Sequence, residues 1–541
     1  MLTARGGPLH RRIQDLPLHP LLAAAYPVLF LFATNAAEQV TLGPLWRPLG
    51  LAVGTAAASL VALRLMVGDW YRAGLLTTIL VIGFFGYGHA WNLAGGRLDS
   101  QWPLIGAWGL LVLIGLYVAW RLRGWARVAT PALNLVAALL LLMNGWGLTQ
   151  AVVALGASAP VERELTSVEL DPGEGRLPDV YTIILDRYAG STALEESFSF
   201  DNEPFLTALE ERGFRVARDA HANYIKTPLS LVSSLDMKLL DADELKEQQE
   251  SGRDRDPIQR LLRERLVVPS AFKELGYQYV HVANWWAPSA TNVDADRVFR
   301  YDGQDEFSTV LAQTTLLRAI NEPEAAPTDP YDWRVLRNHT RYALDTLDQI
   351  PGIPGPKFVY AHLLIPHDPY VFDTDGSFTG RALVAERGRD DSYRRQLEYA
   401  NSRMLGLVDR ILATSGDDAV IVLQADEGPF PERYAEDEWA FRWSDATDAE
   451  LEEKFGVLFA MRVPGADLDA AGFRDDLTLV NTWPIVFNAR FGTDLELLPD
   501  RIWAHESLYQ FFDQFEITDR LRARFGKDAL IPGRITEPRE S

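Results

Sequence analysis

The chain has 541 residues, no cysteine and a formal net charge of −22. This length exceeds the roughly 150 residues that a single domain usually has, so more than one domain is expected. The acidic balance argues against a general nucleic-acid-binding protein, because neutralising phosphates requires a basic surface. Without cysteine, disulfide frameworks, cysteine-ligated zinc, iron–sulfur clusters and thiol nucleophiles are excluded.

The charge is distributed unevenly along the chain. Residues 1–160 contain ten arginines, no lysine and four acidic residues, a charge of +6, whereas residues 161–541 carry −28. A membrane-spanning helix needs roughly 20 mostly apolar residues. The first part contains five charge-free runs that meet or approach this length: 16–37, 48–63, 73–96, 100–120 and 128–161. We therefore predict a transmembrane domain of five helices over residues 1–157.

The arginines of this domain indicate its orientation. Eight lie before the first span, between the second and third, or between the fourth and fifth: Arg5, Arg11, Arg12, Arg64, Arg72, Arg121, Arg123 and Arg127. The other two connections contain only Arg47 and Arg97. By the positive-inside rule, this pattern predicts a multi-pass protein of the cytoplasmic (inner) membrane with a cytoplasmic N-terminus. The C-terminal domain is then periplasmic or extracellular.

Few polar side chains occur within the predicted spans. His89 and Asn92 lie in the third, and Asn134, Asn144 and Gln150 lie in the fifth. Ionisable groups inside a bilayer usually mark a transport path, but a path of buried charges is not present in these spans. Anchoring in the lipid bilayer is the simpler function, with the polar groups at interfaces or in hydrogen bonds between helices.

The rest of the chain has the pattern of an α/β domain. Residues 158–178 are polar and contain proline and glycine, which predicts a linker. In residues 179–541, short apolar runs at 180–185, 277–282, 358–364, 419–423 and 457–461 alternate with helical patterns at 203–211, 230–240, 332–347 and 394–412. This alternation predicts a mostly parallel sheet covered by helices on both faces. Sites in such sheets form beyond the carboxyl ends of the strands.

Carboxylates follow two of the predicted strands. Asp186 ends the segment Tyr-Thr-Ile-Ile-Leu-Asp, and Asp426 and Glu427 follow the strand 419–423. Two adjacent carboxylates repel each other unless a cation or an arginine lies between them. Together, the three side chains would form an oxygen site for Mg²⁺, Mn²⁺ or Ca²⁺. The alternatives are an N-cap for Asp186 and an acidic surface turn for the other two.

Two histidines belong to the strand predicted at 358–364 and the turn after it. His367 lies between Pro366 and the dipeptide Asp368-Pro369, and this rigid setting suits a positioned proton donor to an anion or a leaving group. His362 falls inside the strand pattern, where a histidine with satisfied hydrogen bonds in the core is expected.

Thr227 is the candidate nucleophile. It precedes Pro228, a pattern typical of a helix start. The exposed amides at such an end favour a bound phosphate, and a nearby metal can lower the pKa of the hydroxyl. Plain capping of the helix is the alternative.

In combination, these motifs resemble the alkaline phosphatase/sulfatase superfamily. The resemblance rests on Asp186 after the first strand, Thr227 at a helix start, the segment His367-Asp-Pro-Tyr and the late Asp426-Glu-Gly. Five predicted spans before the domain are similar to the membrane branch of the superfamily, which includes lipoteichoic acid synthases and phosphoethanolamine transferases. The resemblance covers the whole chain in layout and about residues 177–500 in motifs. It implies that Asp186 and Asp426 bind metal, that Thr227 takes the phosphoryl group, and that His367 contacts substrate, with His281 as a further candidate for substrate binding.

One departure from the family pattern affects the metal. The family normally has Asp-His-Gly where this chain has Asp426-Glu427-Gly428. A glutamate adds negative charge and removes a neutral nitrogen ligand. With Glu427 as a ligand, the expected cofactor is therefore one divalent metal, Mn²⁺ or Mg²⁺, with Ca²⁺ as an alternative and Zn²⁺ disfavoured. Sulfatase activity itself is not expected, because Thr227-Pro-Leu-Ser does not match the C/S-x-P-x-R motif that matures to formylglycine.

The resemblance implies a membrane-anchored, metal-dependent phosphotransferase or phosphodiesterase, hence a transferase or hydrolase. It would act on an envelope lipid or glycan through a covalent phospho-threonine. The alternative is a catalytically degenerate relative that serves as an envelope binding or scaffold protein. Glu427 distinguishes the two hypotheses. If it completes a metal site, the enzyme is favoured, and if it pairs with an arginine, the binding protein is favoured.

Overall fold

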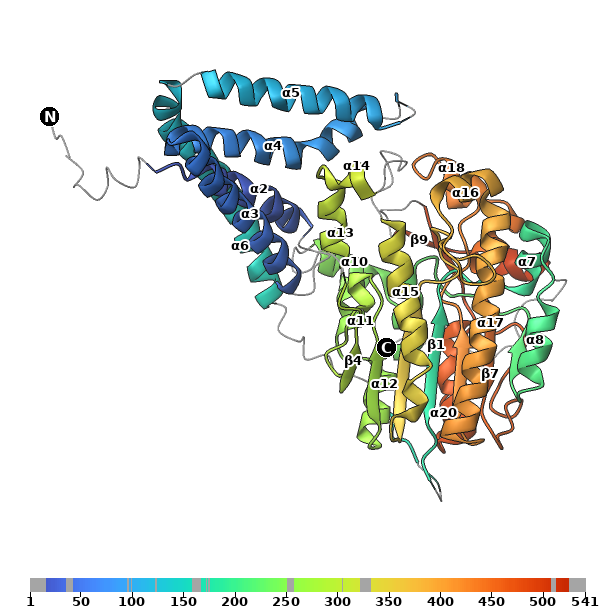
Figure 1. The fold of residues 1–541 in the computed structure, drawn as a ribbon. Helices are drawn as coiled ribbons and strands as arrows, with labels where there is room; N and C mark the ends of the chain where they lie inside the picture. Colours follow the sequence, from blue (N-terminus) through green and yellow to red (C-terminus); the bar gives the residue numbers. More distant parts are fainter. Residues whose placement is uncertain are drawn as a thin grey trace. The chain divides into compact units, whose positions relative to one another are not determined.

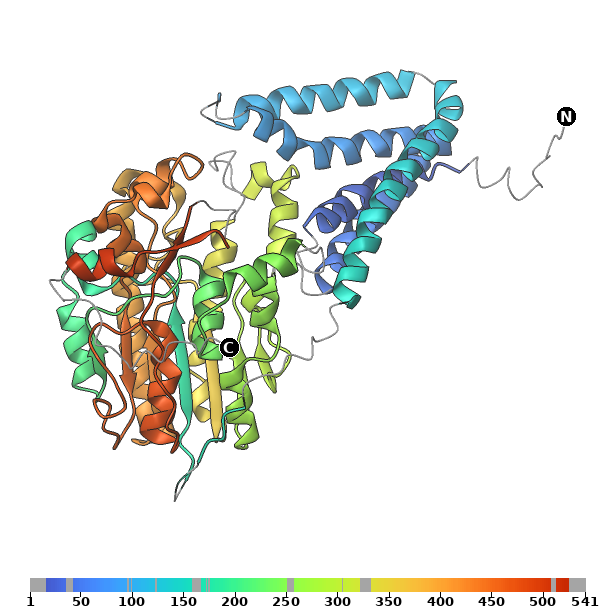
Figure 2. The same ribbon diagram turned by 180° about the vertical axis from the view of Figure 1, so that it is seen from behind.

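The computed structural model describes residues 16–35, 42–94, 97–98, 100–121, 124–157, 167–171, 173, 176–250, 257–303, 305–321, 332–506 and 512–524. Four arginines of the orientation pattern (Arg5, Arg11, Arg12 and Arg123) and much of the predicted linker lie outside these residues. The chain divides into two compact units. The helical unit comprises Met1–Val161 and Gly303–Val335, and the sheet unit comprises Glu162–Asp302 and Leu336–Ser541. Figures 1 and 2 show the ribbon from opposite sides.

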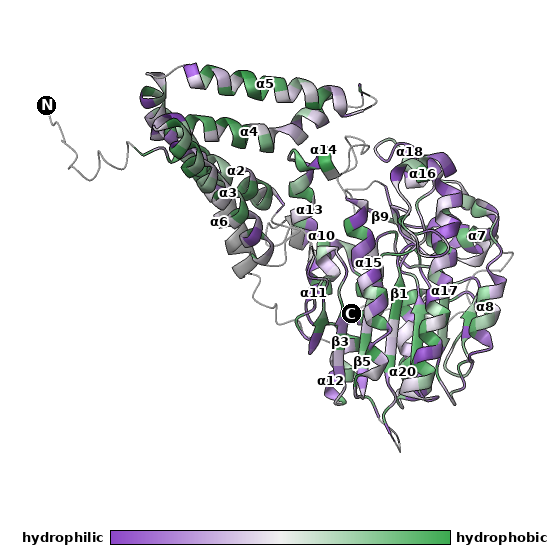
Figure 3. Ribbon diagram, in the orientation of Figure 1, coloured by the Kyte–Doolittle hydropathy of each residue, from purple (hydrophilic) through white to green (hydrophobic). Residues whose placement is uncertain are grey.

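Apolar helices form most of the helical unit, as the green colouring of α3, α4 and α5 shows in Figure 3. They are α2 (His19–Thr34), α3 (Gly43–Val67), α4 (Trp70–Ala94), α5 (Trp102–Arg121) and α6 (Trp125–Ala157). By length and composition, four of them, α3 to α6, can cross a membrane. The second predicted span is longer than its apolar run, since α3 continues through Arg47 and Arg64. The first is shorter than expected, with 16 helical residues, so four of the five predicted spans correspond to helices long and apolar enough to cross a membrane.

Polar side chains in this unit bond one helix to another. The Asn134 side chain on α6 accepts hydrogen bonds from the backbone of Leu18 (3.0 Å) and His19 (2.8 Å) and donates one to the carbonyl of Leu16 (2.8 Å). His19 Nδ1 lies 2.6 Å from the Thr78 hydroxyl on α4. The expected role of Asn134 in hydrogen bonding between helices is therefore confirmed.

A segment from much later in the sequence packs among these helices. It contains α13 (Glu306–Gln313) and α14 (Leu317–Asn321). Phe307 of α13 is buried in a cluster with Phe32 of α2, and their rings meet edge-to-face with centroids 5.4 Å apart. The amide of Gly88 on α4 donates to the Thr314 carbonyl at 3.1 Å. This segment lies within the predicted range 179–541, yet it groups with the apolar helices.

Gly88 is expected to be essential for this packing. A Cβ at Gly88 would lie 2.3 Å from the carbonyl oxygen of Gln313, whereas Gly54 on α3 has nothing within 4 Å of such an atom. Gly88→Ala should therefore destabilise the chain by about 1–3 kcal/mol, as other overpacked sites do. Gly54→Ala should be neutral or stabilising, because alanine favours a helix. Thermal unfolding of the full chain in detergent micelles measures both, and equal unfolding temperatures would contradict this account of Gly88.

The sheet unit is built on a seven-stranded mixed sheet in the order β2-β7-β6-β1-β5-β3-β4. Its strands are β1 (Val180–Leu185), β2 (Arg215–Ala217), β3 (Gln278–Val282), β4 (Arg297–Phe299), β5 (Lys357–Leu363), β6 (Val420–Gln424) and β7 (Phe459–Arg462). The five strands from β6 to β4 are parallel, and β7 is antiparallel to both of its neighbours. The predicted strands and the mostly parallel sheet are confirmed. The short edge strands β2 and β4, and a two-stranded sheet of β8 (Trp503–His505) and β9 (Gln514–Glu516), were not predicted.

Helices cover both faces of this sheet (Figures 1 and 2). On one face, α17 (Arg389–Ser415) packs with α7 (Ser191–Phe198) and α8 (Glu203–Glu210). On the other, α9 (Thr227–Asp236) packs with α12 (Val267–Glu274) and α20 (Thr482–Arg490). The remaining helices are α10 (Ala242–Glu250), α11 (Pro257–Arg263), α15 (Trp333–Leu347), α16 (Arg381–Arg387), α18 (Glu432–Glu436), α19 (Asp448–Phe455) and α21 (Thr518–Arg524).

An aromatic core fixes the second of these faces. The ring of Phe272 on α12 stacks on Phe358 of β5 with centroids 4.8 Å apart and meets Trp483 and Phe487 of α20 at 5.6 and 5.5 Å. Large aromatic side chains contribute much of the free energy of a core because each buries so much apolar area. The packing holds α12 and α20 against the central strands and leaves the strand ends as the place for polar side chains.

Candidate metal and nucleophile site

Register within the sheet brings three polar side chains to one edge. β1 lies between β5 and β6, and Ile184 of β1 pairs with His362 on one side and Gln424 on the other. Asp186 lies two residues after Ile184, and Asp426 lies two residues after Gln424. Because side chains alternate between the two faces of a strand, residues two apart share a face. The register therefore places Asp186, His362 and Asp426 on one face at the carboxyl end of the sheet.

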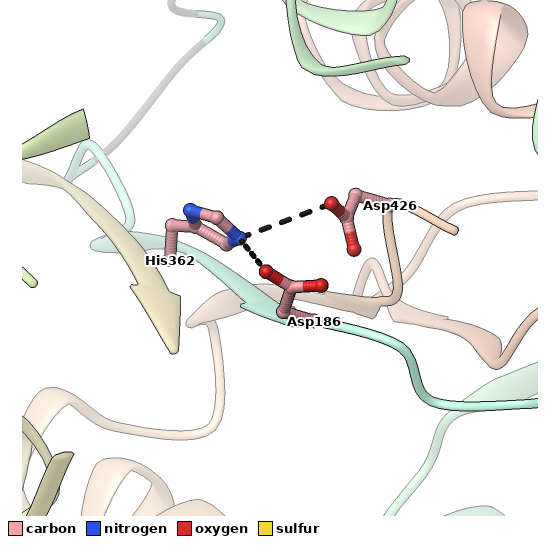
Figure 4. A group of neighbouring side chains, drawn as sticks. All are labelled: Asp186, His362 and Asp426. Carbon is pink, nitrogen blue, oxygen red and sulfur yellow. Dashed lines mark ion pairs between the residues drawn. The ribbon is translucent and has the colours of Figure 1, made fainter. Parts of the chain in front are cut away.

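The three side chains point toward one another (Figure 4). His362 Nε2 lies 3.3 Å from Asp186 Oδ2 and 3.9 Å from Asp426 Oδ2. One ligand atom from each residue can be chosen so that all three lie within 4.8 Å of one another. All three side chains are at most 3% exposed. Two buried carboxylates and an imidazole at this spacing form a candidate metal centre.

The hydrogen bonding of the cluster fits a bound cation. Among the described residues, Asp186 Oδ1, His362 Nε2 and both carboxylate oxygens of Asp426 are buried without a hydrogen-bond partner. A buried polar atom left without a partner costs about 1–3 kcal/mol, so four such atoms in one place would be unfavourable unless a ligand satisfied them. A divalent metal would accept electron pairs from these atoms, and the residues present therefore fit a metal.

The electrostatics of the two aspartates differ. Burial, together with the negative charge of Asp186, raises the pKa of Asp426 to about 8. Burial alone would also raise the pKa of Asp186, but the charges of His367, His362 and Arg187 outweigh it and hold that pKa well below its usual value. A negative charge on Asp426 beside that on Asp186 is therefore unfavourable. A bound cation would offset this repulsion.

The surroundings of His362 leave its Nε2 directed at the aspartates. Ser289 Oγ and Asn284 Nδ2 lie 3.1 and 3.2 Å from Nδ1, and the Asn284 amide donates to the backbone carbonyl of His362 at 3.0 Å. Metal-binding histidines are commonly fixed by such a bond on the nitrogen that faces away from the metal. His362 is buried, as expected of a core histidine, with partners at Nδ1 and the Asp186 carboxylate 3.3 Å from Nε2.

Ser289 should therefore affect metal binding without touching the metal. Ser289→Ala is expected to weaken metal affinity by about 10–100-fold, the range for loss of such an outer hydrogen bond. Ser377→Ala, an exposed serine in a turn, is the matched control and should leave the affinity unchanged. Titration of the metal into the full chain by calorimetry measures this effect. Equal affinities for the two variants would show that Ser289 does not orient His362.

Thr227 lies at the start of α9, next to the cluster. Its side chain faces Asp426 closely enough to lower the pKa of that carboxyl slightly, against the larger opposite effect of burial. The N-cap residue of α9 is Lys226, whose side chain makes no capping hydrogen bond. Thr227 is therefore not the cap residue that the alternative hypothesis required. The structure brings the candidate nucleophile beside a candidate metal ligand.

His367 also belongs to this neighbourhood. Its side chain, 26% exposed, lies on the turn after β5, and its positive charge is among the causes that lower the pKa of Asp186. A partly exposed imidazole near the buried cluster is placed to meet a ligand that enters from solvent.

Glu427 and His281 have partners within the protein. Glu427 Oε1 lies 2.8 Å from Lys454 Nζ and 3.7 Å from Arg187 Nε, and Glu427 is not in the group whose ligand atoms converge. The ring nitrogens of His281 lie 3.1 Å from the Tyr279 hydroxyl and 2.9 Å from the Ser289 carbonyl. Burial lowers the pKa of His281 to about 4. His281 therefore packs behind Ser289, and Glu427 forms ion pairs beside Asp426.

Two basic residues of the site were not predicted from the sequence. Lys454, from α19, is fully buried beside Glu427 and donates to the Gly428 carbonyl at 2.9 Å. Arg187 follows Asp186 directly and adopts a left-handed backbone conformation, with φ of +61°. The position of Arg187 next to Asp186 in the sequence indicated a charged site. Lys454 lies 26 residues from Gly428, and no local pattern connects the two.

Comparisons with known proteins find similarity at a low level only. No protein-family model matches the chain, and no curated protein matches its sequence. The integral membrane lipooligosaccharide phosphoethanolamine transferase A of Neisseria meningitidis matches in structure with 12% identity and a TM-score of 0.39, covering 86% of this chain and 95% of that one. The C-terminal periplasmic domain of EptC from Escherichia coli matches with 14% identity and a TM-score of 0.39, covering 63% and 93%.

A protein of the alkaline phosphatase superfamily from Vibrio parahaemolyticus matches with 12% identity and a TM-score of 0.37, covering 66% of this chain and 81% of that one. Similarity this low does not assign the chain to a family, so the geometry of its own residues has to support a function.

Proposed function

We propose that the chain is a membrane-anchored, metal-dependent phosphotransferase or phosphodiesterase that works through a covalent phospho-threonine at position 227. One observation carries this proposal: the buried group Asp186, His362 and Asp426 has four polar atoms without partners, and Thr227 lies beside it. Phosphoryl transfer needs a positioned nucleophile and concentrated positive charge, and this edge of the sheet would supply both once a metal is bound.

Asp186, His362 and Asp426 would hold the metal. An imidazole nitrogen with carboxylate oxygens suits Mn²⁺ or Zn²⁺ better than Ca²⁺, which prefers oxygen ligands alone. Zn²⁺ is disfavoured where a glutamate replaces a nitrogen ligand, but His362 supplies a nitrogen ligand to this group of side chains. When bound, the metal would lower the pKa of a neighbouring hydroxyl and offset negative charge on a phosphoryl group.

The chain's own residues would carry the transfer in two steps. The Thr227 oxygen forms a bond to phosphorus while the bond from phosphorus to the leaving oxygen breaks. The hydroxyl proton of Thr227 goes to solvent, and His367 donates a proton to the leaving oxygen, which departs as an alcohol. Water or an acceptor hydroxyl then attacks the phosphorus of the phospho-threonine and gives its proton to His367, while the bond from phosphorus to the Thr227 oxygen breaks and this oxygen takes up a proton from solvent. Hydrolysis and transfer differ only in the acceptor.

Glu427 does not change this conclusion. Its ion pairs with Lys454 and Arg187 are the arrangement that was expected of a binding protein. We propose that His362 takes the place of Glu427 among the ligands, so the pairing of Glu427 still leaves three side chains for a metal. We propose that Glu427 fixes the positions of Lys454 and Arg187, both of which lie beside the site.

The apolar helices support an envelope substrate at the membrane. We propose that α2 to α6 anchor the chain in the cytoplasmic membrane, with the sheet unit on the periplasmic or extracellular side, as the arginine pattern predicts. An anchored enzyme meets lipids and lipid-linked glycans at high local concentration, which favours these as substrates.

The test is to trap the phosphorylated protein. The full chain in detergent micelles, loaded with Mn²⁺ or Zn²⁺, is incubated with bis(p-nitrophenyl) phosphate, quenched in acid and analysed by peptide mass spectrometry. The proposal requires release of p-nitrophenol that depends on the metal, and a p-nitrophenyl-phosphoryl group, the part of the diester that remains after one p-nitrophenol leaves, on the peptide that contains Thr227. Turnover without metal, or a phosphoryl group on another residue, would overturn it.

A further inference from the structure

Three cationic side chains surround one aromatic ring beside the candidate metal site. The ring belongs to Phe430, and its centroid lies 3.6 Å from Lys454 Nζ, 4.6 Å from Arg187 Cζ and 4.7 Å from Lys226 Nζ. The face of an aromatic ring attracts cations, but it carries no net negative charge. The ring therefore positions these three charges without neutralising them.

The carboxylates in this cluster neutralise two of the three cations. Lys454 pairs with Glu427 at 2.8 Å, and Arg187 pairs with Asp368 and, at 3.7 Å, with Glu427. Among the described hydrogen bonds and ion pairs, the ammonium of Lys226 has none, and its nearest partner is the Phe430 ring. The exposed Glu438 acts on it only through the electric field. One positive charge is thus left over at a partly buried position.

The pKa of Lys226 agrees with this count of charges. Burial lowers it, Glu427 raises it, and the positive charges of Lys454 and Arg187 lower it further, to about 7. A cation that is removed from water and surrounded by other cations is unfavourable unless an anion compensates it. The cluster therefore has the charge of an anion-binding site that lacks its anion.

The position of Lys226 indicates which anion would bind. It is the N-cap residue of α9, a helix of 10 residues, and the next residue is Thr227. A helix N-terminus carries partial positive charge and free amide protons that favour phosphate groups. An anion held by Lys226 would thus lie at the end of the helix that presents the candidate nucleophile.

We propose that Lys226 binds a non-bridging oxygen of the substrate's phosphoryl group and so positions the phosphorus for Thr227. The inference deepens the proposed function and rests on it for the identity of the substrate. Phe430 holds the ammonium in place, while Glu427 holds Arg187 and Lys454 away from the same oxygen. Lys226 is then a substrate-binding residue that the motifs of the chain did not indicate.

The test measures anion binding apart from turnover. Inorganic phosphate is titrated by calorimetry into the full chain in detergent micelles, loaded with Mn²⁺, for the wild type, Lys226→Met and Lys226→Arg. Lys238→Met, an exposed lysine just after the other end of α9, is the control. Lys226→Met should weaken phosphate binding about tenfold or more, because a charge-assisted hydrogen bond is lost, while Lys226→Arg should retain most of the affinity. Metal content should be the same in all four proteins.

Steady-state kinetics with bis(p-nitrophenyl) phosphate complete the test. Lys226→Met should raise KM more than it lowers kcat, and Lys226→Arg should restore KM. Wild-type protein that does not bind phosphate, or Lys226→Met with unchanged phosphate affinity and KM, would overturn the inference even if Thr227 is phosphorylated. Phosphate binding that depends on Lys226 in a protein without turnover would support the inference while the proposed function fails.

Discussion

Asp426→Asn is expected to abolish metal binding and, at the same time, to stabilise the metal-free protein at alkaline pH. Asp426 is buried beside Asp186, and its pKa is raised to about 8 by burial and by that neighbour. The folded chain therefore holds a proton that the unfolded chain, with a pKa of about 4, releases. The contribution of Asp426 to the free energy of unfolding therefore falls as the pH rises from about 4 to about 8. Asparagine at position 426 carries no charge, so the variant does not lose stability in this way as the pH rises.

Unfolding of the full chain in micelles, treated with a chelator, measures this effect at pH 5 and pH 8. The variant and the wild type should differ little at pH 5 and most at pH 8, where the variant should be the more stable. Added metal at 100 times its Kd should stabilise the wild type by about 2.7 kcal/mol and the variant not at all. The control is Asp417→Asn, an exposed aspartate, which should change neither result. A variant that still gains stability from metal would show that Asp426 is not a ligand.

Thr227→Ala is expected to lower turnover about 10³-fold or more while metal binding persists. The threonine supplies the only oxygen that the proposal allows to bond to phosphorus, so its loss removes the covalent step. Thr227→Ser keeps the hydroxyl and should still form a phosphorylated intermediate. Calorimetry should find the same metal stoichiometry in all three proteins, since Thr227 is not one of the three ligands.

Acid-quenched samples distinguish a lost nucleophile from a damaged site. The phosphoryl group should appear on residue 227 in the wild type and in Thr227→Ser, and it should be absent in Thr227→Ala. Thr374→Ala, an exposed threonine, controls for general effects of substitution. Full turnover by Thr227→Ala would contradict the proposed mechanism, because water would then attack phosphorus without a covalent intermediate.

The sequence pattern predicted the parts of the site that depend on local signals. Asp186 and Asp426 each follow a continuous apolar run, and parallel strands end at one edge of a sheet, so their convergence could be predicted without a structure. Thr227 before Pro228 indicated the start of α9 in the same way. Each of these signals lies within a few residues of the side chain that it places.

His362 could not be identified as a candidate ligand by the same reasoning. It lies inside β5, where burial is expected of any residue, and burial alone does not distinguish a ligand from a core histidine. The deciding fact is the register of β5 against β1, which pairs His362 with Ile184, two residues before Asp186. Register between strands far apart in sequence depends on the whole sheet, and the local pattern does not contain it.

The partners of Glu427 and the packing of α13 depend on distant parts of the chain in the same way. Lys454 reaches Glu427 from another helix, and Phe307 packs against Phe32. Composition did separate the apolar helices from the acidic remainder. It could not show that α13 and α14 join those helices, because their sequence is not apolar enough to predict it.

The most direct test of the account is the metal stoichiometry of the full chain. Purified protein in detergent micelles is saturated in turn with Mn²⁺ and Zn²⁺, freed of excess metal and analysed by elemental mass spectrometry, beside His362→Ala and Glu427→Gln. We expect one metal ion per chain in the wild type and in Glu427→Gln, and none in His362→Ala. A wild-type chain that binds no metal, or a site that is lost in Glu427→Gln and kept in His362→Ala, would contradict the assignment of Asp186, His362 and Asp426 as its ligands.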